Sequence, residues 1–362
     1  MIRPKTLASP YQASYKKYVL QFKKPAGTSR GYLYHQENFF VQLTDPETPT
    51  VFGIGEAGPL VGLSVDDRPD FEEKIAQVCE AINAGERLGD LQLADWPALA
   101  FAIEMAALDL QNGGRRRWFD TAFSRGEAIL PTHGLIWMAD QKGLQRQIEQ
   151  KVAQGFRCVK LKVGALPFER ECEVLATIRR MYTADEVEIR LDANGAFSAD
   201  NALKMLETLA QYKIFVLEQP IKPGQWGVMA DLCRNSPIPI ALDEELIGQF
   251  EMLHRRQLLE QIKPACLVLK PTLIGGFTSA EEWIALAQER QIGWWVNSAL
   301  ESNVGLNAIA QWVSHFETDF VHGLGTGQLY TNNISSPLQL VDAGLTINLA
   351  QKWDLPIGMP HD

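Results

Sequence analysis

Long apolar runs and paired cysteines are missing from this 362-residue sequence. Its five cysteines are scattered and never spaced as Cys-x-x-Cys, which excludes a disulfide framework and a cysteine zinc site. No run of about 18 apolar residues is present, so the sequence predicts no transmembrane helix. The first residues, MIRPKTLASPYQ, also lack the apolar segment of a signal peptide. These absences predict a cytoplasmic protein with reduced thiols.

Positive charge is scarce relative to negative charge. The 34 Lys and Arg residues against 44 Asp and Glu residues give a formal net charge of −10 at pH 7. This balance argues against nucleic acid and anionic membranes as partners, and leaves small-molecule chemistry open. The short basic run 115–117 is expected to be a solvated helix end.

The six histidines show no metal-binding spacing, and we expect His133 and His322 to be structural.

From about residue 130, short apolar segments alternate with stretches of helical periodicity. Helical patterns cover 168–181, 198–212 and 278–290, with Ser198 as an expected N-cap. The predicted strands are 134–138, 158–163, 187–192, 214–219, 238–244, 266–270, 293–298 and 320–325. Eight strands that alternate with helices predict an α/β protein with a parallel sheet closed into a (β/α) barrel.

The first 125 residues follow a different order. Strand-like segments come first (15–22, 31–43 and 51–54), and two helical stretches follow (70–83 and 96–112). This order predicts an α+β domain in front of the barrel. We therefore expect an N-terminal capping domain, a barrel domain and a C-terminal segment that packs back on the capping domain, covering residues 1–125, 126–328 and 329–362.

Charged side chains stand at the ends of the predicted barrel strands. In RCVKLKVG (157–164), Lys160 and Lys162 fall on one strand face while the apolar residues between them fall on the other. After Lys162, one charged residue follows in each βα unit, at separations of 30, 26, 25 and 27 residues: Asp192, Glu218, Asp243 and Lys270. Because the active site of such a barrel lies at the carboxyl ends of its strands, these residues are expected to converge.

Three carboxylates that share one barrel mouth would repel one another without a cation. Asp192, Glu218 and Asp243 offer the all-oxygen ligation that suits Mg²⁺, with Mn²⁺ as a substitute. Asn194 and Glu244, which lie next to these ligands in the sequence, are expected to support them. The sequence thus predicts a divalent metal site.

The lysines around this expected metal site favour removal of a proton next to a carboxylate. The metal would stabilise the enediolate, and Lys162 would take the proton, with Lys270 on the opposite side of the mouth. A free lysine has a pKa of about 10.4, which is too high for a base at neutral pH. The ammonium group of Lys160, two residues away, would lower that pKa. We therefore expect a small-molecule carboxylate substrate.

Each of these residues also has an ordinary structural interpretation. A lone inward lysine is commonly ion-paired, and a lone aspartate at a strand end often caps the next helix. Six such residues in register at consecutive strand ends are hard to explain as separate accidents. The remaining structural alternative is a single ion-pair network at the barrel mouth that has no catalytic role.

The motifs KLK, LDANGAF, LEQP, ALDEE and LVLKPTLIGG, in this order and spacing, resemble the enolase superfamily, specifically its muconate lactonizing subgroup. The resemblance covers nearly the whole chain and implies a (β/α)7β barrel (a modified TIM barrel) with an N-terminal capping domain. The mandelate racemase subgroup would carry a catalytic histidine in the segment that reads GWWVNSALES here, where no histidine occurs.

Within the subgroup, GIGEAGPLVGLS (53–64), EQPIKPGQW (218–226) and FKKPAGTSRG (22–31) resemble the o-succinylbenzoate synthases. This implies Mg²⁺-dependent syn dehydration of 2-succinyl-6-hydroxy-2,4-cyclohexadiene-1-carboxylate to o-succinylbenzoate, an intermediate of menaquinone synthesis. Lys162 would remove the proton and return it to the departing hydroxyl, while protonated Lys270 stabilises the enediolate. GLGTGQLY (323–330) lacks the Asp-x-Asp element of dipeptide epimerases, which argues against an aminated substrate.

Four further residues are candidates for substrate binding. Arg30 lies in a loop where the resemblance implies a flap, and a solvated hairpin turn explains it equally well. Leu60 is expected in the apolar lid of the substrate pocket, although an ordinary Pro-Leu turn explains it too. Ser298 is expected to bind a substrate oxygen, while Glu301 is equally explained as a residue at a helix N-terminus.

Three functions remain open from the sequence. The first is the dehydratase. The second is an N-acylamino acid racemase or dipeptide epimerase in which Lys162 and Lys270 act as opposed bases. The third is a barrel without catalytic activity that binds a ligand or partner, which the intact set of lysines and acids disfavours.

Overall fold

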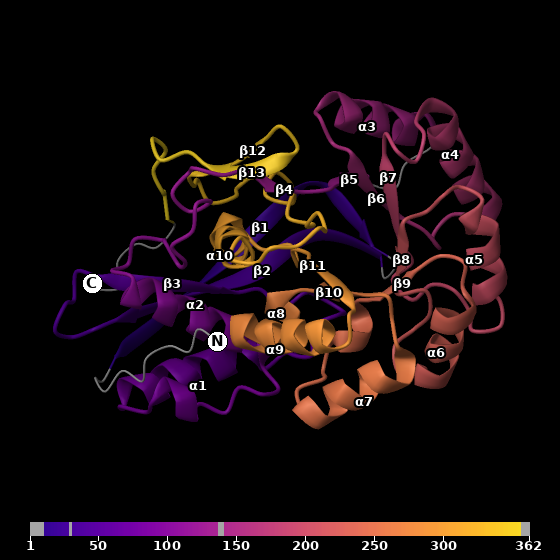
Figure 1. The fold of residues 1–362 in the computed structure, drawn as a ribbon. Helices are drawn as coiled ribbons and strands as arrows, with labels where there is room; N and C mark the ends of the chain where they lie inside the picture. The colour runs from indigo at the N-terminus through magenta and orange to yellow at the C-terminus, as the bar shows by residue number, and fades with distance from the viewer. Residues whose placement is uncertain (1–10, 29–30, 137–140, 356–362) are drawn as a thin grey trace.

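The computed structural model describes residues 11–28, 31–136 and 141–355, and shows an N-terminal α+β part packed against a parallel barrel (Figure 1). The N-terminal part contains an antiparallel sheet with strand order β1-β2-β3. Its elements are β1 (Gln12–Thr28), β2 (Gly31–Thr44), β3 (Phe52–Ala57), α1 (Phe71–Asn83), η1 (Leu88–Asp90) and α2 (Pro97–Gln111). Alternation along β2 turns Phe39 and Val41 toward α1 and α2, and Phe40 toward the core that includes the barrel.

Helix α2 lies directly on strand β3. A Cβ atom at Gly53 would be 1.9 Å from the carbonyl oxygen of Ala106, and one at Gly55 would be 1.8 Å from that of Ala102. Only glycine permits this approach of helix and sheet backbones. The Gly-x-Gly spacing in GIGEAG is therefore a packing feature that anchors the sheet to α2.

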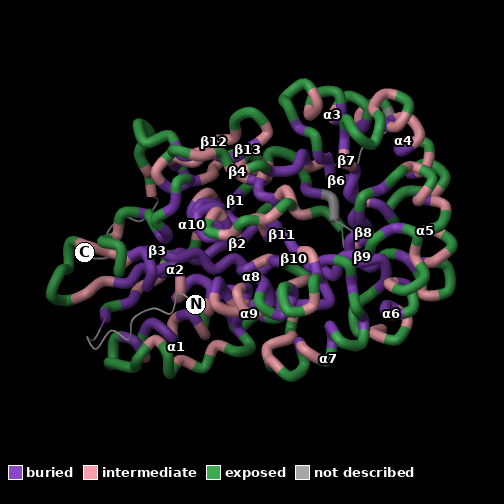
Figure 2. The backbone as a smooth tube through the Cα atoms, in the orientation of Figure 1, coloured by how far each residue is buried: buried purple, intermediate pink, exposed green. Residues whose placement is uncertain are grey.

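The barrel consists of seven parallel strands in the order β11-β10-β9-β8-β7-β6-β5, surrounded by helices. The strands are β5 (Gly134–Ile136), β6 (Cys158–Lys162), β7 (Glu188–Asp192), β8 (Val216–Glu218), β9 (Ile240–Leu242), β10 (Cys266–Leu269) and β11 (Gly293–Val296). The helices are α3 (Gln141–Ala153), α4 (Phe168–Met181), α5 (Ala202–Ala210), α6 (Trp226–Asn235), η2 (Glu244–Leu246), α7 (Met252–Ile262), α8 (Pro271–Ile274), α9 (Gly276–Glu289) and α10 (Asn303–Val313). Figure 2 shows that these strands are buried while the outer helix surfaces are exposed.

The eighth predicted strand, 320–325, is reduced to two bridges that close the barrel. His322 pairs with Thr132, next to β5, and Gly323 pairs with Asn297, next to β11. The amide of His133 donates to the carbonyl oxygen of His322 at 2.8 Å. The predicted fold class, a (β/α)7β barrel with an N-terminal capping domain, is confirmed, but its last strand is shorter than the apolar pattern indicates.

Two local predictions were wrong. The helix expected over 198–212 spans only Ala202–Ala210, and Ser198 forms a turn in which its carbonyl oxygen accepts from the amides of Asn201 and Ala202. Arg116 is not solvated, because its guanidinium pairs with the buried carboxylate of Asp109 at the end of α2.

The C-terminal segment contacts both parts of the chain. The hairpin of β12 (Leu338–Val341) and β13 (Gly344–Ile347) pairs with β4 (Leu130–Pro131), just before the barrel. At the start of this segment, the carbonyl oxygen of Leu329 accepts from the amide of Lys23 at 2.8 Å, in strand β1 of the N-terminal part. The boundaries proposed for the three domains stay a prediction.

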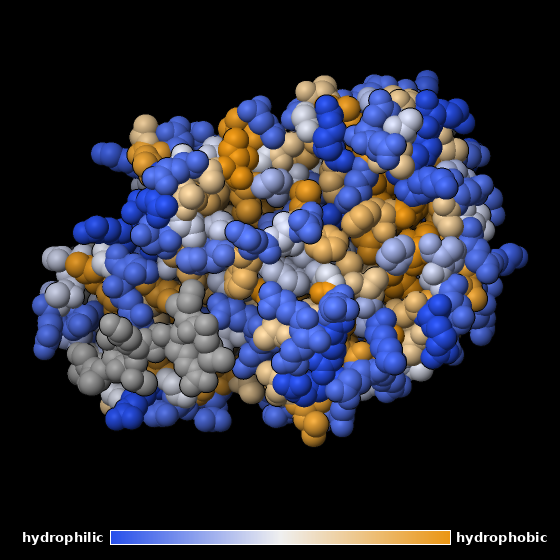
Figure 3. Space-filling model, in the orientation of Figure 1, coloured by the Kyte–Doolittle hydropathy of each residue, from blue (hydrophilic) through white to orange (hydrophobic). Residues whose placement is uncertain are grey.

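The face in Figure 3 is largely hydrophilic, and its apolar surface gathers beside α4 and α5. Within the described ranges, no helix combines the length and apolar character needed to cross a membrane.

Candidate active site

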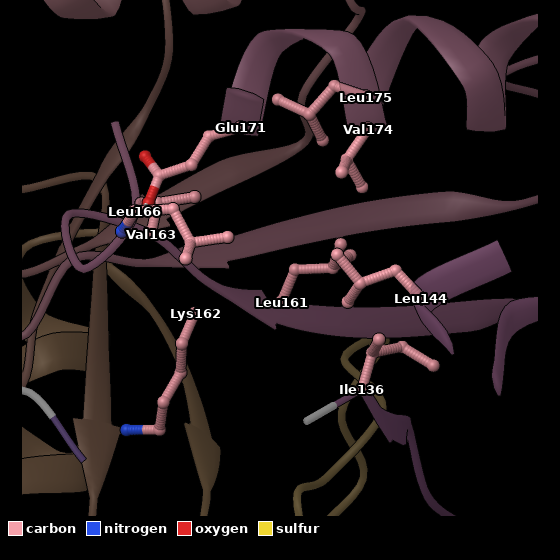
Figure 4. Close-up of a pocket in the computed structure, with 9 residues that line it drawn as sticks. All are labelled: Ile136, Leu144, Leu161, Lys162, Val163, Leu166, Glu171, Val174 and Leu175. Carbon is pink, nitrogen blue, oxygen red and sulfur yellow. The ribbon is translucent and has the colours of Figure 1, made fainter. Parts of the chain in front are cut away.

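Strand β6 separates an apolar face from a charged one. Leu161 and Val163 pack against Leu144 of α3 and Val174 of α4, around a small cavity between the strand and these helices. Figure 4 shows the side chain of Lys162 pointing away from this apolar group. The alternation predicted from KLK therefore places the lysine ammonium groups inside the barrel.

Strand pairing brings the charged ends of the strands to one level. In the parallel register, Lys162 of β6 lies opposite Asp192 of β7, and Asp192 lies opposite Glu218 of β8. Asp243 directly follows β9, and Lys270 directly follows β10. The residues predicted from the spacing of the βα units thus lie at one end of the barrel.

The three carboxylates form a compact buried cluster. Asp192, Glu218 and Asp243 each offer an oxygen, and these oxygens lie within 4.8 Å of one another. Their residues are 2%, 0% and 2% exposed, and Oε1 of Glu218 has no hydrogen-bond partner among the described residues. Burial raises the pKa of Glu218 to about 7. This all-oxygen set with an unpartnered oxygen fits a hard divalent cation.

Two lysines hold this acidic cluster from different sides. The Nζ atom of Lys160 lies 2.9 Å from Oδ2 of Asp192 and also contacts Glu218. The Nζ atom of Lys270 lies 2.7 and 2.6 Å from the two carboxylate oxygens of Asp243. Burial opposes protonation of both lysines, but the neighbouring carboxylates outweigh it and raise the pKa of each. Both lysines are therefore held as cations.

Lys162 has a different environment. Its Nζ atom donates to Oδ1 of Asn194 at 2.5 Å and lies 3.7 Å from Oδ2 of Asp192. Burial lowers the pKa of Lys162, and the ammonium groups of Lys160 and Lys270 add to this effect against the opposing charge of Asp192. Of the three lysines, Lys162 is the one whose surroundings favour the neutral amine.

Asn194 and Glu244 connect the ends of two strands. Nδ2 of Asn194 donates to Oε1 of Glu244 at 2.9 Å, and the amide of Asn194 donates to Oδ1 of Asp192 at 3.0 Å. Asn194 therefore contacts both Lys162 and a carboxylate of the cluster, and its supporting role stays a prediction.

The lysines and Asp192 face a solvent-connected cavity of about 100 Å³. Its polar wall contains Ser298 and Thr326, and the capping domain contributes Leu60 and Leu63. The remaining lining residues are His133, Leu135, Lys160, Lys162, Asp192, Asn194, Lys270, Asn297, Ala299, Leu300, Gly323 and Gly325. The cavity is thus apolar toward the capping domain and charged toward the barrel strands, which suits a small carboxylate with a hydrophobic body.

The four predicted substrate-binding residues occupy different places. Leu60 and Ser298 line the cavity, whereas Arg30 lies outside the described residues. Glu301 is buried behind Ser298, whose hydroxyl donates to Oε2 of Glu301 at 2.6 Å, and Oε1 of Glu301 accepts from the hydroxyl of Thr272. This geometry favours a positioning role for Glu301 over contact with substrate. Substrate contact by Leu60 and Ser298 stays a prediction.

Several cavity residues were not predicted from the sequence. Leu135 stands beside Lys160 in the pairing of β5 and β6, and the alternation of that strand could have indicated it. Leu63 and Thr326 lie in loops without such a pattern. His133 is buried in the cavity wall, and burial lowers its pKa well below its usual range, which keeps its imidazole neutral.

Comparison with known proteins adds three findings. The family model of enolase C-terminal domain-like proteins matches residues 143–347. An o-succinylbenzoate synthase of Desulfotalea psychrophila is 44% identical over 93% of this chain and 99% of its own length. A crystal structure of MenC from Desulfotalea psychrophila has a TM-score of 0.84 at 40% identity, covering 93% of this chain and 99% of that chain.

More distant relatives share the fold. A D-Ala-D/L-Ala epimerase of Cytophaga hutchinsonii is 26% identical over 83% of this chain and 82% of its own length. The structure of a muconate lactonizing enzyme of Pseudomonas fluorescens complexed with muconolactone has a TM-score of 0.80 at 20% identity and covers 96% of this chain and 98% of that chain.

Proposed function

The chain belongs to the enolase superfamily, and we propose that it is an o-succinylbenzoate synthase. The reaction is the syn dehydration of 2-succinyl-6-hydroxy-2,4-cyclohexadiene-1-carboxylate to o-succinylbenzoate. The observation that carries this proposal is the convergence of two lysines with different neighbours on one cavity beside the carboxylate cluster, since Lys270 contacts Asp243 whereas Lys162 contacts the neutral Oδ1 of Asn194. The near full-length identity to an o-succinylbenzoate synthase supports the same reaction.

Lys162 acts first as the base. Its neutral amine takes the proton from the carbon next to the substrate carboxylate, and the C–H bond pair moves toward the carboxylate as the enediolate forms. The resulting ammonium then returns that proton to the hydroxyl on the same face of the ring. The C–O bond breaks, water leaves and the ring becomes aromatic, so one residue serves both halves of a syn elimination.

Lys270 contributes positive charge rather than proton transfer. The carboxylate of Asp243 holds its ammonium group in a fixed position, and that charge stabilises the enediolate as it develops. Lys160 is similarly held by Asp192 and Glu218, and helps to keep Lys162 unprotonated.

Asp192, Glu218 and Asp243 would hold Mg²⁺, and Mn²⁺ in its place. When bound, the cation supplies charge that stabilises the carboxylate of the substrate as it becomes an enediolate. Asn194 would keep Asp192 and Lys162 oriented toward the cavity.

The test is the change in ultraviolet absorbance as the purified protein with Mg²⁺ consumes the cyclohexadiene substrate. We expect turnover that falls by at least about 10²-fold in Lys162→Ala, the lower end for loss of a general base, and that a chelator abolishes. Lys204→Ala, an exposed lysine on α5, is the control with unchanged turnover. Folded, Mg²⁺-loaded protein without turnover would contradict the proposal.

A racemase or epimerase is the second candidate, because Lys162 and Lys270 line the same cavity and the epimerase of Cytophaga hutchinsonii is a relative. Exchange of the α-proton of N-succinylamino acids in deuterated water, without dehydration of the diene, would favour this activity. Tight ligand binding without either reaction would favour a binding barrel.

A further inference from the structure

Gln219 directly follows the carboxylate ligand Glu218 and is fully buried. Its backbone has a φ angle of 41°, in the left-handed region that non-glycine residues rarely adopt. Such a conformation persists only where the surrounding structure holds it. The main chain of Gln219 is held on both sides, since its amide donates to the carbonyl oxygen of Ala241 at 2.9 Å and its carbonyl oxygen accepts from the amide of Gly195 at 2.7 Å.

The side chain of Gln219 reaches across to the next strand end. Its Oε1 atom accepts from the amides of Asp243 at 3.1 Å and Glu245 at 3.2 Å. Its Nε2 atom donates to the carbonyl oxygen of Ile221 and to Oε2 of Glu245, both at 3.0 Å. A single buried side chain thus fixes the main chain at Asp243, while its own backbone fixes the main chain at Glu218.

Glu245 completes the connection. This carboxylate is 2% exposed, and no ion pair involving it occurs among the described residues. Its Oε1 atom accepts from the amide of Gly224 at 2.7 Å, in the loop that follows β8. The carboxylate oxygens of Glu245 accept hydrogen bonds from Gln219 and Gly224, and loss of either donor leaves a buried oxygen unsatisfied.

We propose that Gln219 and Glu245 form a positioning pair that sets the distance between the metal ligands Glu218 and Asp243. The pair lines neither the cavity nor the carboxylate cluster, so it acts through the ligands rather than on the metal or the substrate. The proposal rests on the proposed metal site. Its consequence is that the pair controls affinity for the cation, apart from any contribution to folding.

The experiment measures Mn²⁺ binding to the purified full-length protein through the electron paramagnetic resonance signal of free Mn²⁺, without substrate. Gln219→Glu keeps the size of the side chain but places its carboxylate against that of Glu245. Glu245→Gln places the NH₂ group of the new amide against one of two donors, the main-chain amide of Gly224 or Nε2 of Gln219. Each variant is expected to weaken Mn²⁺ binding by about 10–100-fold, as loss of residues that orient metal ligands typically does.

The reciprocal variant Gln219→Glu with Glu245→Gln separates positioning from general damage. It restores one amide and one carboxylate facing each other, and the amide introduced at position 245 can still accept from Gly224, but the carboxylate introduced at position 219 can no longer donate to the carbonyl oxygen of Ile221. Because contacting residues act non-additively while the contact with Ile221 stays lost, its Kd is expected to lie between the wild-type value and that of the weaker single variant.

Gln311→Glu is the matched control. Gln311 is equally buried, and it accepts from the amide of Phe119 at 3.2 Å and donates to Asn307 at 3.0 Å, remote from the carboxylate cluster. This variant is expected to lower the melting temperature but to leave the Kd for Mn²⁺ unchanged.

Single variants that fold and bind Mn²⁺ like the wild type would overturn the proposal while leaving the proposed function intact. A reciprocal variant that binds no better than the weaker single variant would also overturn it. If Gln219→Glu does not fold, Glu245→Gln and the reciprocal variant decide by the same comparison. A wild-type protein that binds no Mn²⁺ overturns the metal site and this proposal together.

Discussion

The three lysines at the barrel mouth have the same chemistry but different neighbours. Lys160 and Lys270 contact carboxylates at 2.9 Å or less, whereas the closest polar partner of Lys162 is the neutral oxygen of Asn194. Burial affects all three, so the balance between carboxylates and ammonium groups decides which of them loses its proton most easily. The assignment of base and cation at the residue scale follows from these neighbours.

Lys270→Gln is predicted to separate catalysis from metal binding. Turnover should fall by at least about 10²-fold, because the fixed charge opposite Lys162 is lost. Mn²⁺ should bind at least about fivefold more tightly, since removal of a cation that contacts Asp243 relieves ~1 kcal/mol or more of repulsion and frees both oxygens. Kinetics and Mn²⁺ titration of the same preparation measure both effects, and weaker Mn²⁺ binding would contradict the prediction.

At the scale of elements, the connection between β6 and α4 holds Lys162 in place. Oε1 of Glu171, in the first turns of α4, accepts from three successive amides, those of Gly164, Ala165 and Leu166, at 2.7, 3.1 and 3.1 Å. Gly164 has a φ angle of 88°, and a Cβ atom there would lie 2.4 Å from Cβ of Ala196. The loop is therefore clamped by its own helix on one side and by the loop after β7 on the other.

Glu171→Ala is predicted to destabilise the fold and to reduce turnover more than it changes KM. Three amides of this exposed loop would lose their shared acceptor, at a net cost of about 0.5–1.5 kcal/mol for each hydrogen bond that water does not replace. Glu171→Gln keeps an acceptor oxygen and should recover most of the activity. Glu173→Ala, an exposed residue of the same helix, is the control. Urea unfolding and steady-state kinetics measure these effects, and equal behaviour of Glu171→Ala and Glu173→Ala would rule out the clamp.

At the scale of the whole molecule, two glutamates, one buried and one half-buried, dock the capping part onto the barrel. Glu56 of β3 accepts from the amides of Ser302 and Gly305, both at 2.7 Å, at the start of α10. Glu104 of α2 accepts from the amides of Phe277 at 2.5 Å and Thr278 at 3.0 Å, at the start of α9. Both contacts place a carboxylate at a helix N-terminus, where amide groups that have no acceptor within the helix favour a negative charge.

Burial raises the pKa of Glu104 from its ordinary value of 4.5 to about 7 in the folded protein. The folded chain therefore binds more protons than the unfolded chain between these values, so this group makes the free energy of unfolding fall as the pH rises from about 4.5 to 7. Above pH 7 its contribution becomes constant.

Glu104→Gln should remove this part of the pH dependence. The variant is expected to gain on the order of 1–3 kcal/mol relative to wild type between pH 4.5 and 7, with the difference constant above that range. Urea unfolding at several pH values measures the difference, with Glu80→Gln on the exposed face of α1 as control. Parallel pH curves for wild type and Glu104→Gln would show that Glu104 does not titrate in this window.

The sequence by itself determined the barrel and its charged mouth, because strand alternation and one charged residue per βα unit map directly onto neighbouring strand ends in a parallel sheet. It also determined the alternation that turns Lys160 and Lys162 inward. Only the tertiary structure decided the pairing of Arg116 with Asp109, the burial of Glu301 behind Ser298 and the connection of Gln219 to Glu245.

The two docking glutamates, Glu56 and Glu104, show why the sequence alone does not predict such contacts. Glu56 meets Ser302, and Glu104 meets Phe277, across separations of 246 and 173 residues. The spacing of apolar residues in a local segment predicts only whether that segment forms a helix or a strand. These carboxylates meet their hydrogen-bond donors only after separate elements have packed together. The same burial that brings the partners together then sets the pKa of each group, so the energetics of the capping contact belong to the folded molecule.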